Sequence, residues 1–386
     1  MLKMNPALTH LDCTATDCVN AHRQLGCAAR SQIQKTLARR LAETGSPAGV
    51  NHRLRRARQF GTALQAKLNH PALDATLRTA LAVYQASLNA WAGAAKLDQF
   101  RHPWLAEALD GRPVSAEELA FLLQEDEVGC QTGVYRERDG SLLLWHAEED
   151  VETEPGQRFD QLRLFSFRAS QGAIATAFIY PDLLPGPAFG WQGADYAQAV
   201  DTLHIRPLEL SEPLLPNTLA WLSLYLGPQV SRAKLAQQLG PFAGGYSLTT
   251  VSRQSGLVQV EKVEFANTQV AVTNLGPAAG GWLFQTNILR DLSQPIGAEE
   301  LTSPESRAWN ETRQKRTARF LRIAQNAEDA LPLIFRMLQS RASGDSAYAN
   351  PDVKAHFVCH LAMAATTLWV GGGPASRETA RWRFSA

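Results

Sequence analysis

The chain changes character at residues 129–150, which read GCQTGVYRERDGSLLLWHAEED. Residues 132–136 and 141–146 have strand patterns, and Arg138-Asp139-Gly140 between them is a turn signal. The stretch therefore predicts a β-hairpin. Because a tight turn sets the far ends of its two strands side by side, we expect Cys130 to lie next to the polar cluster of residues 146–150.

The sequence before this hairpin predicts helices. Apolar residues recur at three- and four-residue spacings over 20–45 and 51–98. Ser115 and Glu118 form a capping-box pattern, in which each side chain bonds the backbone N–H of the other. We expect a helical segment that extends up to the hairpin.

The sequence after the hairpin predicts further strands with helices between them. The predicted strands are 161–169, 173–180, 246–253, 257–261, 269–273, 281–286, 366–370 and 379–384. The predicted helices are 216–226, 231–239 and 303–341, the last with a break near Asn326. Strands and helices do not alternate one for one, so the pattern predicts an α+β layered domain instead of a doubly wound sheet.

The composition excludes several classes of protein. The 386 residues include 38 Lys+Arg and 37 Asp+Glu, and 45% are hydrophobic while only 19% are charged. A chain this apolar is not mainly disordered, and its net charge of +1 lacks the basic footprint of a nucleic-acid-binding protein. The basic run Arg53–Arg58 is interpreted as the solvated face of a helix. We expect no nucleic-acid partner.

Membrane and export signals are weak. The best apolar run, residues 214–226, is short and contains Pro216 and Asn217, whereas a spanning helix needs about 20 apolar residues. The first residues lead into a polar stretch without the apolar run of a signal peptide, and five cysteines do not suggest a disulfide framework. We expect a cytoplasmic protein with no membrane partner.

Cys130 has two interpretations. A Cys that follows a turn Gly is often a buried core residue. However, residues 129–132 followed by the hairpin and residues 146–149 resemble the marker of the acyl-CoA:6-aminopenicillanate acyltransferase-like enzymes, a family of N-terminal-nucleophile cysteine hydrolases. Residues 103–107, 115–124, 180–186 and 284–287 resemble further segments of that family, in the right order.

The resemblance implies a fold and a reaction. It implies the N-terminal-nucleophile fold, a four-layer αββα sandwich of antiparallel sheets, here preceded by a helical N-terminal segment. It also implies that the protein cuts its own Gly129–Cys130 bond into chains 1–129 and 130–386, which stay together as a heterodimer. The freed Cys130 would then attack a small amide or an acyl thioester.

The resemblance also assigns roles to individual residues. Glu148, eighteen positions after the Cys, is the catalytic acidic residue, although Glu149 and Asp150 offer alternative registers. Asn287 belongs to the oxyanion hole. The substrate-binding candidates are His146, Asp201 and Arg163. Arg163 is named from its charge and not from the resemblance, and the alternative is an Arg that is solvated on a strand face.

The chemistry of an N-terminal Cys suits these roles. A free thiol titrates near 8.5 and needs activation, whereas a new α-amine titrates at about 7.7–8.0 and can act as the base. Glu148 would orient the α-ammonium, and Asn287 would stabilise the oxyanion.

Departures from the family pattern support a rival interpretation. Gln131, Ala147, Gln285 and Trp221 replace common family residues, and Asp201 stands where the family often has an Asn. The alternative is an uncleaved relative that binds a partner or ligand.

A metal site is a weaker possibility. Two Cys and two His lie close together near the N-terminus, but their spacing is not that of a known zinc finger, so we expect no metal and no cofactor. The four residues are His10, Cys13, Cys18 and His22.

Overall fold

The structure is a computed structural model. It describes residues 9–97, 100–123, 129–149, 163–180, 183–205, 208, 210–292, 303–340, 353–372 and 380–385. No helix among these residues is both long enough and apolar enough to cross a membrane.

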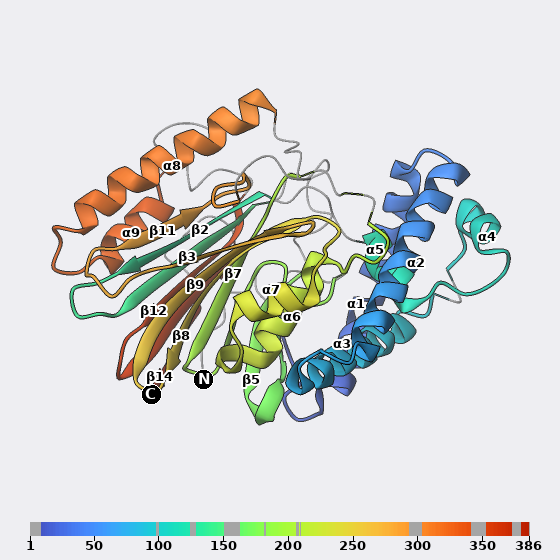
Figure 1. The fold of residues 1–386 in the computed structure, drawn as a ribbon, viewed down its shortest axis with the longest axis horizontal. Helices are drawn as coiled ribbons and strands as arrows, with labels where there is room; N and C mark the ends of the chain where they lie inside the picture. The colour runs from blue at the N-terminus through green and yellow to red at the C-terminus, as the bar shows by residue number, and fades with distance from the viewer. Residues whose placement is uncertain are drawn as a thin grey trace.

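The predicted helical N-terminal segment is confirmed, and its helices lie together at one side of the molecule (Figure 1). They are α1 (Cys18–Glu43), α2 (Pro47–Asn69), α3 (Ala75–Ala94), α4 (Pro103–Leu109) and α5 (Ala116–Leu123). The capping box at the start of α5 is also confirmed, because Ser115 Oγ accepts from the Glu118 N–H and Glu118 Oε2 accepts from the Ser115 N–H. The run 51–98 is divided in two, because Asp74 caps a new helix by accepting from two backbone N–H groups.

The strands form two sheets. The eight-stranded sheet has the order β1 (Thr9–Asp12), β4 (Arg163–Arg168), β5 (Ile174–Ile179), β6 (Phe189–Gln192), β7 (Tyr196–Thr202), β8 (Gly245–Gln254), β9 (Leu257–Ala266), β10 (Gln269–Asn274). The six-stranded sheet has the order β11 (Trp282–Gln285), β2 (Gly129–Arg136), β3 (Leu142–Glu149), β12 (Val353–Leu361), β13 (Ala365–Gly372), β14 (Ala380–Ser385). Among the described strands only β1 and β4 pair in parallel.

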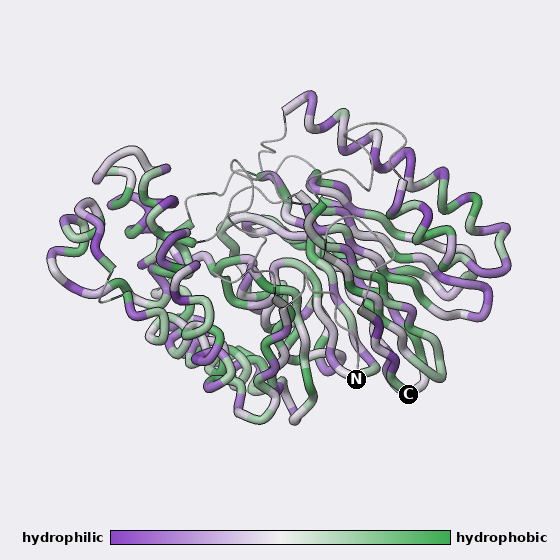
Figure 2. The backbone as a smooth tube through the Cα atoms, turned by 180° about the vertical axis from the view of Figure 1, so that it is seen from behind, coloured by the Kyte–Doolittle hydropathy of each residue, from purple (hydrophilic) through white to green (hydrophobic). Residues whose placement is uncertain are grey.

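Helices cover the outer face of each sheet. Residues of α1, α3, α6 (Pro216–Leu226) and α7 (Arg232–Leu239) share one core with the eight-stranded sheet. A second core lies between the sheets, and a third joins the six-stranded sheet to α8 (Pro304–Ala324) and α9 (Leu331–Leu338). Hydrophobic segments run through the stacked strands, while α8 mixes hydrophilic and hydrophobic residues (Figure 2). The α+β class is confirmed, and this packing is compatible with a sandwich.

Several strands were not predicted. β1, β6, β7 and β12 have no counterpart in the sequence-based prediction. β6 has only four residues, and nearly all of β7 is buried, so neither shows the alternation of a half-exposed strand. The break predicted near Asn326 is confirmed by the gap between α8 and α9. The predicted strand starts at Gln161 and Thr379 lie outside the described residues.

The hairpin β2–β3 has the predicted pairing. Cys130 lies directly opposite Glu148, and Gly133 lies opposite Trp145. Gly140 takes a φ of 87° in the turn, a value that glycine adopts readily. Cys130 therefore lies beside residues 146–149 of the predicted polar cluster, as expected.

We expect Gly133→Ala to destabilise the protein. A Cβ at Gly133 would lie 2.0 Å from Cζ2 of Trp145, a fully buried ring, so the ring must move. The overpacking should cost about 1–3 kcal/mol and lower the midpoint of urea unfolding. Gly93→Ala is the matched control: a Cβ there meets nothing within 4 Å, and in a helix the change should gain about 0.5–1 kcal/mol. Equal midpoints for the two variants would contradict this account of the hairpin.

Candidate functional site

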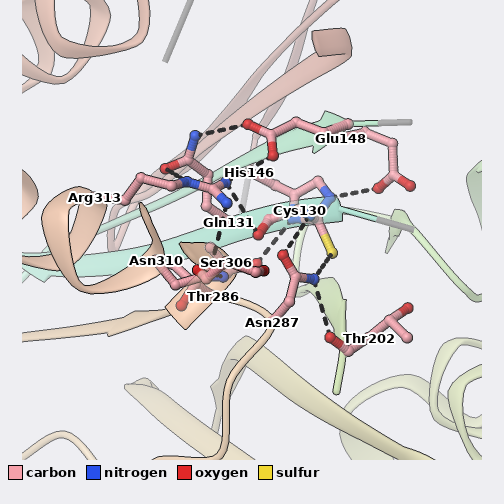
Figure 3. A network of polar contacts seen from close by, with 12 residues as sticks. Cys130, Gln131, His146, Glu148, Thr202, Thr286, Asn287, Ser306, Asn310 and Arg313 are labelled. Carbon is pink, nitrogen blue, oxygen red and sulfur yellow. Dashed lines mark hydrogen bonds and ion pairs between the residues drawn. The ribbon is translucent and has the colours of Figure 1, made fainter. Parts of the chain in front are cut away.

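Cys130 is the second residue of β2 and has its side chain between the two sheets, only 1% exposed. The Asn287 side chain contacts it at two atoms: Asn287 Oδ1 accepts from the Cys130 N–H at 3.1 Å, and Asn287 Nδ2 lies 3.4 Å from Sγ. Nδ2 also donates to the Thr202 carbonyl at 3.0 Å (Figure 3). The nucleophile and the oxyanion residue named from the sequence are thus in direct contact, although they are 157 positions apart.

The loop that carries Asn287 is held by one buried carboxylate. Glu264, on β9, accepts from the backbone N–H groups of residues 290–292, at 3.0, 2.5 and 2.6 Å in order. A carboxylate that receives several backbone N–H groups holds a loop strongly, because charged hydrogen bonds are stronger than neutral ones. Glu264 was not identified from the sequence, since its partners lie on a loop 26 to 28 positions away.

Glu148 is fully buried and takes part in a series of hydrogen bonds between side chains. His146 Nε2 lies 2.7 Å from Glu148 Oε2, His146 Nδ1 lies 2.8 Å from Thr132 Oγ1, and the Tyr180 hydroxyl donates to Glu148 Oε1. Burial lowers the pKa of His146 to about 4, so the ring is neutral at pH 7. It follows that Nε2–H donates to Glu148 and Nδ1 accepts from Thr132. The structure shows His146 orienting Glu148, and its contact with substrate stays a prediction.

Asp201, on β7 of the other sheet, lies near the hydrogen-bonded pair His146 and Glu148. Its carboxylate is fully buried, and neither oxygen has a hydrogen-bond partner among the described residues. Ser247, its partner in the register with β8, has a buried hydroxyl that also lacks one there. Burial raises the pKa of Asp201 to about 6, and the neighbouring His146 opposes this rise. A carboxylate with such a pKa can accept a proton near pH 6, and the predicted contact of Asp201 with substrate stays a prediction.

The thiol itself is not activated in the continuous chain. Burial raises the pKa of Cys130 well above its ordinary value, and the charges of Asp201 and Glu148 raise it further. Hydrogen bonds from the Thr202 backbone and Asn287 lower the pKa but do not outweigh these effects. A nucleophilic Cys130 therefore needs a base or a nearby positive charge.

Arg313, on α8, was missed by the sequence analysis. Its Nη2 lies 2.8 Å from Glu149 Oε2 and 3.3 Å from the Cys130 carbonyl oxygen, and its guanidinium stacks on Trp309 at 4.0 Å. Gln131 Nε2 donates to the other Glu149 oxygen at 3.2 Å. Because neighbouring strand residues point to opposite faces, Glu149 turns to α8 while Glu148 turns to the space between the sheets. Of these two acidic residues, Glu148 is the one directly opposite Cys130, and its catalytic role stays a prediction.

Arg163, the remaining substrate-binding candidate, lies on a strand of the eight-stranded sheet. It is the first residue of β4, where its backbone pairs with Thr9 and Ile179 in the eight-stranded sheet. Its predicted contact with substrate stays a prediction. Asp150, the last member of the predicted cluster, lies outside the described residues.

The residues that suggested zinc do not converge. His22 Nδ1 donates to the Cys18 carbonyl at 2.7 Å, and its Nε2 accepts from the Trp221 indole at 3.1 Å. Cys13 donates to a Gln side chain, and His10 bonds to a Ser on β4. No group of three metal-ligating side chains occurs within the described parts of the chain. Trp221, one of the departures from the family pattern, serves here as a packing and hydrogen-bonding partner of His22.

Comparison with known proteins adds no relative. No protein-family model matches the chain, and no curated protein matches it significantly.

We expect Asp201→Asn to stabilise the protein at high pH. The folded-state pKa of about 6 lies above the ordinary 3.8, so the wild type loses stability as the pH rises from about 4 to 6 and stays less stable above that range. The shift is about two units, so the variant should be more stable by about 2–3 kcal/mol at pH 8 and equal near pH 3.5. Urea unfolding at both pH values measures the difference.

Asp195→Asn is the matched control. Asp195 is half exposed and forms an ion pair with Arg253, so its loss should cost at most about 1 kcal/mol at pH 8. If Asp201→Asn proved destabilising at pH 8, the carboxylate would have a partner that this structure does not show.

Proposed function

We propose that the protein is a self-processing N-terminal-nucleophile cysteine amidohydrolase or acyltransferase, with the four-layer fold of that class. The observation that carries the proposal is the double contact of Asn287 with the backbone nitrogen and the sulfur of Cys130. These are the two atoms that an N-terminal Cys would use as base and nucleophile. An amide group beside both of them can orient the amine and donate to an oxyanion.

Self-cleavage would use the residues around Cys130. Asp201 accepts the thiol proton, Sγ attacks the Gly129 carbonyl carbon, and the bond from that carbon to the Cys130 nitrogen breaks as the nitrogen gains a proton. Water then hydrolyses the thioester and leaves Gly129 with a free carboxylate. A Cβ at Gly129 would lie only 3.2 Å from Glu149 Oε2, so this position leaves little room for a larger residue before the cleaved bond.

Turnover of substrate would follow from the change in charge. Cleavage replaces a neutral amide with an α-amine, whose protonated form adds a positive charge beside the thiol. That charge lowers the pKa of Cys130, whereas in the continuous chain the neighbouring carboxylates raise it. The amine then serves as base while the thiol takes the acyl group of a small amide or thioester, and water or an amine releases it.

The two chains would remain one folded unit. Leu25, Leu37, Phe60, Leu81 and Trp91 of the N-terminal segment are buried in the core that includes the eight-stranded sheet. Separating residues 1–129 would expose this core. We propose a cytoplasmic location for the heterodimer, in keeping with the five free cysteines.

One observation favours the alternative, an uncleaved binding protein. The Cys130 thiol is buried and its pKa is raised, as for an inert core cysteine. The intact mass of the purified wild-type protein under denaturing conditions separates the two functions. We expect two chains that divide between Gly129 and Cys130, whereas a single full-length mass would leave the binding protein as the better account.

A further inference from the structure

An open groove lies where the two sheets end in turns, and we call it the turn groove. Its volume is about 600 Å³, which is within the usual range for ligand pockets. Its walls come from the β2–β3 turn, the start of β9, the segment that follows β10 and the β12–β13 turn. The β2–β3 turn points away from the N-terminal helices (Figure 1).

The turn groove is separate from the Cys130 site. Arg136, which lines the groove, is the last residue of β2, whereas Cys130 is the second residue of that strand. At about 3.3 Å per residue, a strand of this length places the two residues about 20 Å apart. The groove is therefore a second place at which this protein could hold a ligand.

The Arg136 side chain lies where the walls of the groove meet. It is only 6% exposed, and its Nε, Nη1 and Nη2 donate to the carbonyl oxygens of Gly276, Gly140 and Val258, at 3.0, 3.0 and 3.4 Å. These carbonyls belong to three of the segments that form the walls. A guanidinium has five N–H groups, so two of them have no acceptor among the described residues.

The positive charge of Arg136 has no negative partner in the part of the chain that the structure describes. The two acidic residues of the adjacent turn have other partners. Glu137 Oε2 lies 3.0 Å from His360 Nε2, and Asp139, which also lines the groove, accepts from the Ser141 N–H. Burial lowers the pKa of Arg136 from its ordinary value, but an Arg stays protonated in a protein. Buried charges are normally paired, so the groove is complementary to an anionic group.

Apolar side chains make up much of the remaining lining. Leu257 and Met363 are 62% and 51% exposed, and Val260 and Leu275 join the lining to the core between the sheets. Exposed apolar side chains beside a groove favour a ligand that covers them. One buried cation in such surroundings favours a single negative charge on that ligand, as a carboxylate has.

We infer that the turn groove binds a small carboxylic acid with an apolar chain. The carboxylate accepts from the two remaining N–H groups of Arg136, and such charged hydrogen bonds are stronger than neutral ones. The chain covers Leu257 and Met363, which removes apolar surface from water. Binding here does not depend on a catalytic Cys130, because no residue of that site lines the groove.

Octanoate is the probe that tests this site. Calorimetry on the full-length wild-type protein compares it with octan-1-ol, which has a chain of the same length but no charge. We expect octanoate to bind about tenfold more tightly, which corresponds to about 1.4 kcal/mol. Equal dissociation constants, or no binding of octanoate, would overturn the inference.

Two exposed apolar residues locate the bound acid. Met363→Glu places a negative charge in the lining, so the affinity for octanoate should fall about tenfold or more. Ile174→Glu is the matched control, because Ile174 is 49% exposed at the start of β5 and lies outside the lining, so the affinity should not change. An unchanged affinity in Met363→Glu, or an equal loss in both variants, would place octanoate elsewhere and overturn the assignment.

Arg136→Gln tests the charge itself. Octanoate should then bind no more tightly than octan-1-ol, since the guanidinium is gone. Circular dichroism checks the fold of this variant, because three hydrogen bonds to carbonyls are lost with the side chain. A folded Arg136→Gln protein that kept the tenfold preference would overturn the role of Arg136. Met363→Glu changes an exposed residue, so it decides the location of the site even if Arg136→Gln does not fold.

Discussion

Cys130→Ala should give a single full-length chain and no detectable turnover of amides or thioesters. The substitution removes the sulfur atom, which attacks the Gly129 carbonyl in the proposed reaction. Alanine is smaller than cysteine, so it fits the same buried position in the strand. Intact mass under denaturing conditions, measured beside the wild type, gives the result for self-cleavage. Release of the thiol leaving group gives the result for turnover.

Cys27→Ala is the matched control for this experiment. Cys27 is an exposed free cysteine on α1, far along the chain from the hairpin, so its loss should leave both masses and turnover as in the wild type. Cleavage that persists in Cys130→Ala, or that is lost in Cys27→Ala, would be incompatible with Cys130 as the nucleophile.

Asn287→Ala should lower the rate of acylation by about 10²–10³, equivalent to about 3–4 kcal/mol of transition-state stabilisation. The amide lies 3.4 Å from the sulfur and 3.1 Å from the Cys130 nitrogen, so its loss affects both the oxyanion and the base. Because the oxyanion exists only in the transition state, kcat should fall much more than KM changes. Single-turnover kinetics on cleaved protein measures the step directly.

Asn274→Ala provides a comparison at the end of β10, where the side chain is exposed. Its kcat should equal that of the wild type. If Asn287→Ala raised KM and left kcat unchanged, Asn287 would position the substrate and would not stabilise the oxyanion.

The contacts that the sequence predicts well are local ones. Cys130 and Glu148 are joined by a short hairpin whose register follows from its turn, so their pairing could be predicted from the residues alone. Asn287 and Asp201 were named through the family resemblance, and they lie beside Cys130 although no pattern in the chain links them to it. The resemblance thus named two residues that the hydrophobic periodicity of the sequence does not identify.

The contacts that were missed depend on how helices and sheets stack. Arg313 reaches the Cys130 carbonyl across 183 positions, and nothing in the helical pattern of α8 marks it apart from the other basic residues of that helix. β7, which carries Asp201, is almost entirely buried, so it lacks the alternation that identifies a strand. A single sequence contains no record of which buried faces meet.

The hydrogen bond from Arg313 to the Cys130 carbonyl would hold the N-terminus that cleavage creates. A fresh terminus is normally the loosest part of a protein, because nothing precedes it to hold it down. Here the first residue would be tied through its carbonyl to α8, through its nitrogen to Asn287, and through its strand to β3. Cleavage would break one peptide bond, and the contacts with α8, Asn287 and β3 would still hold Cys130 in place.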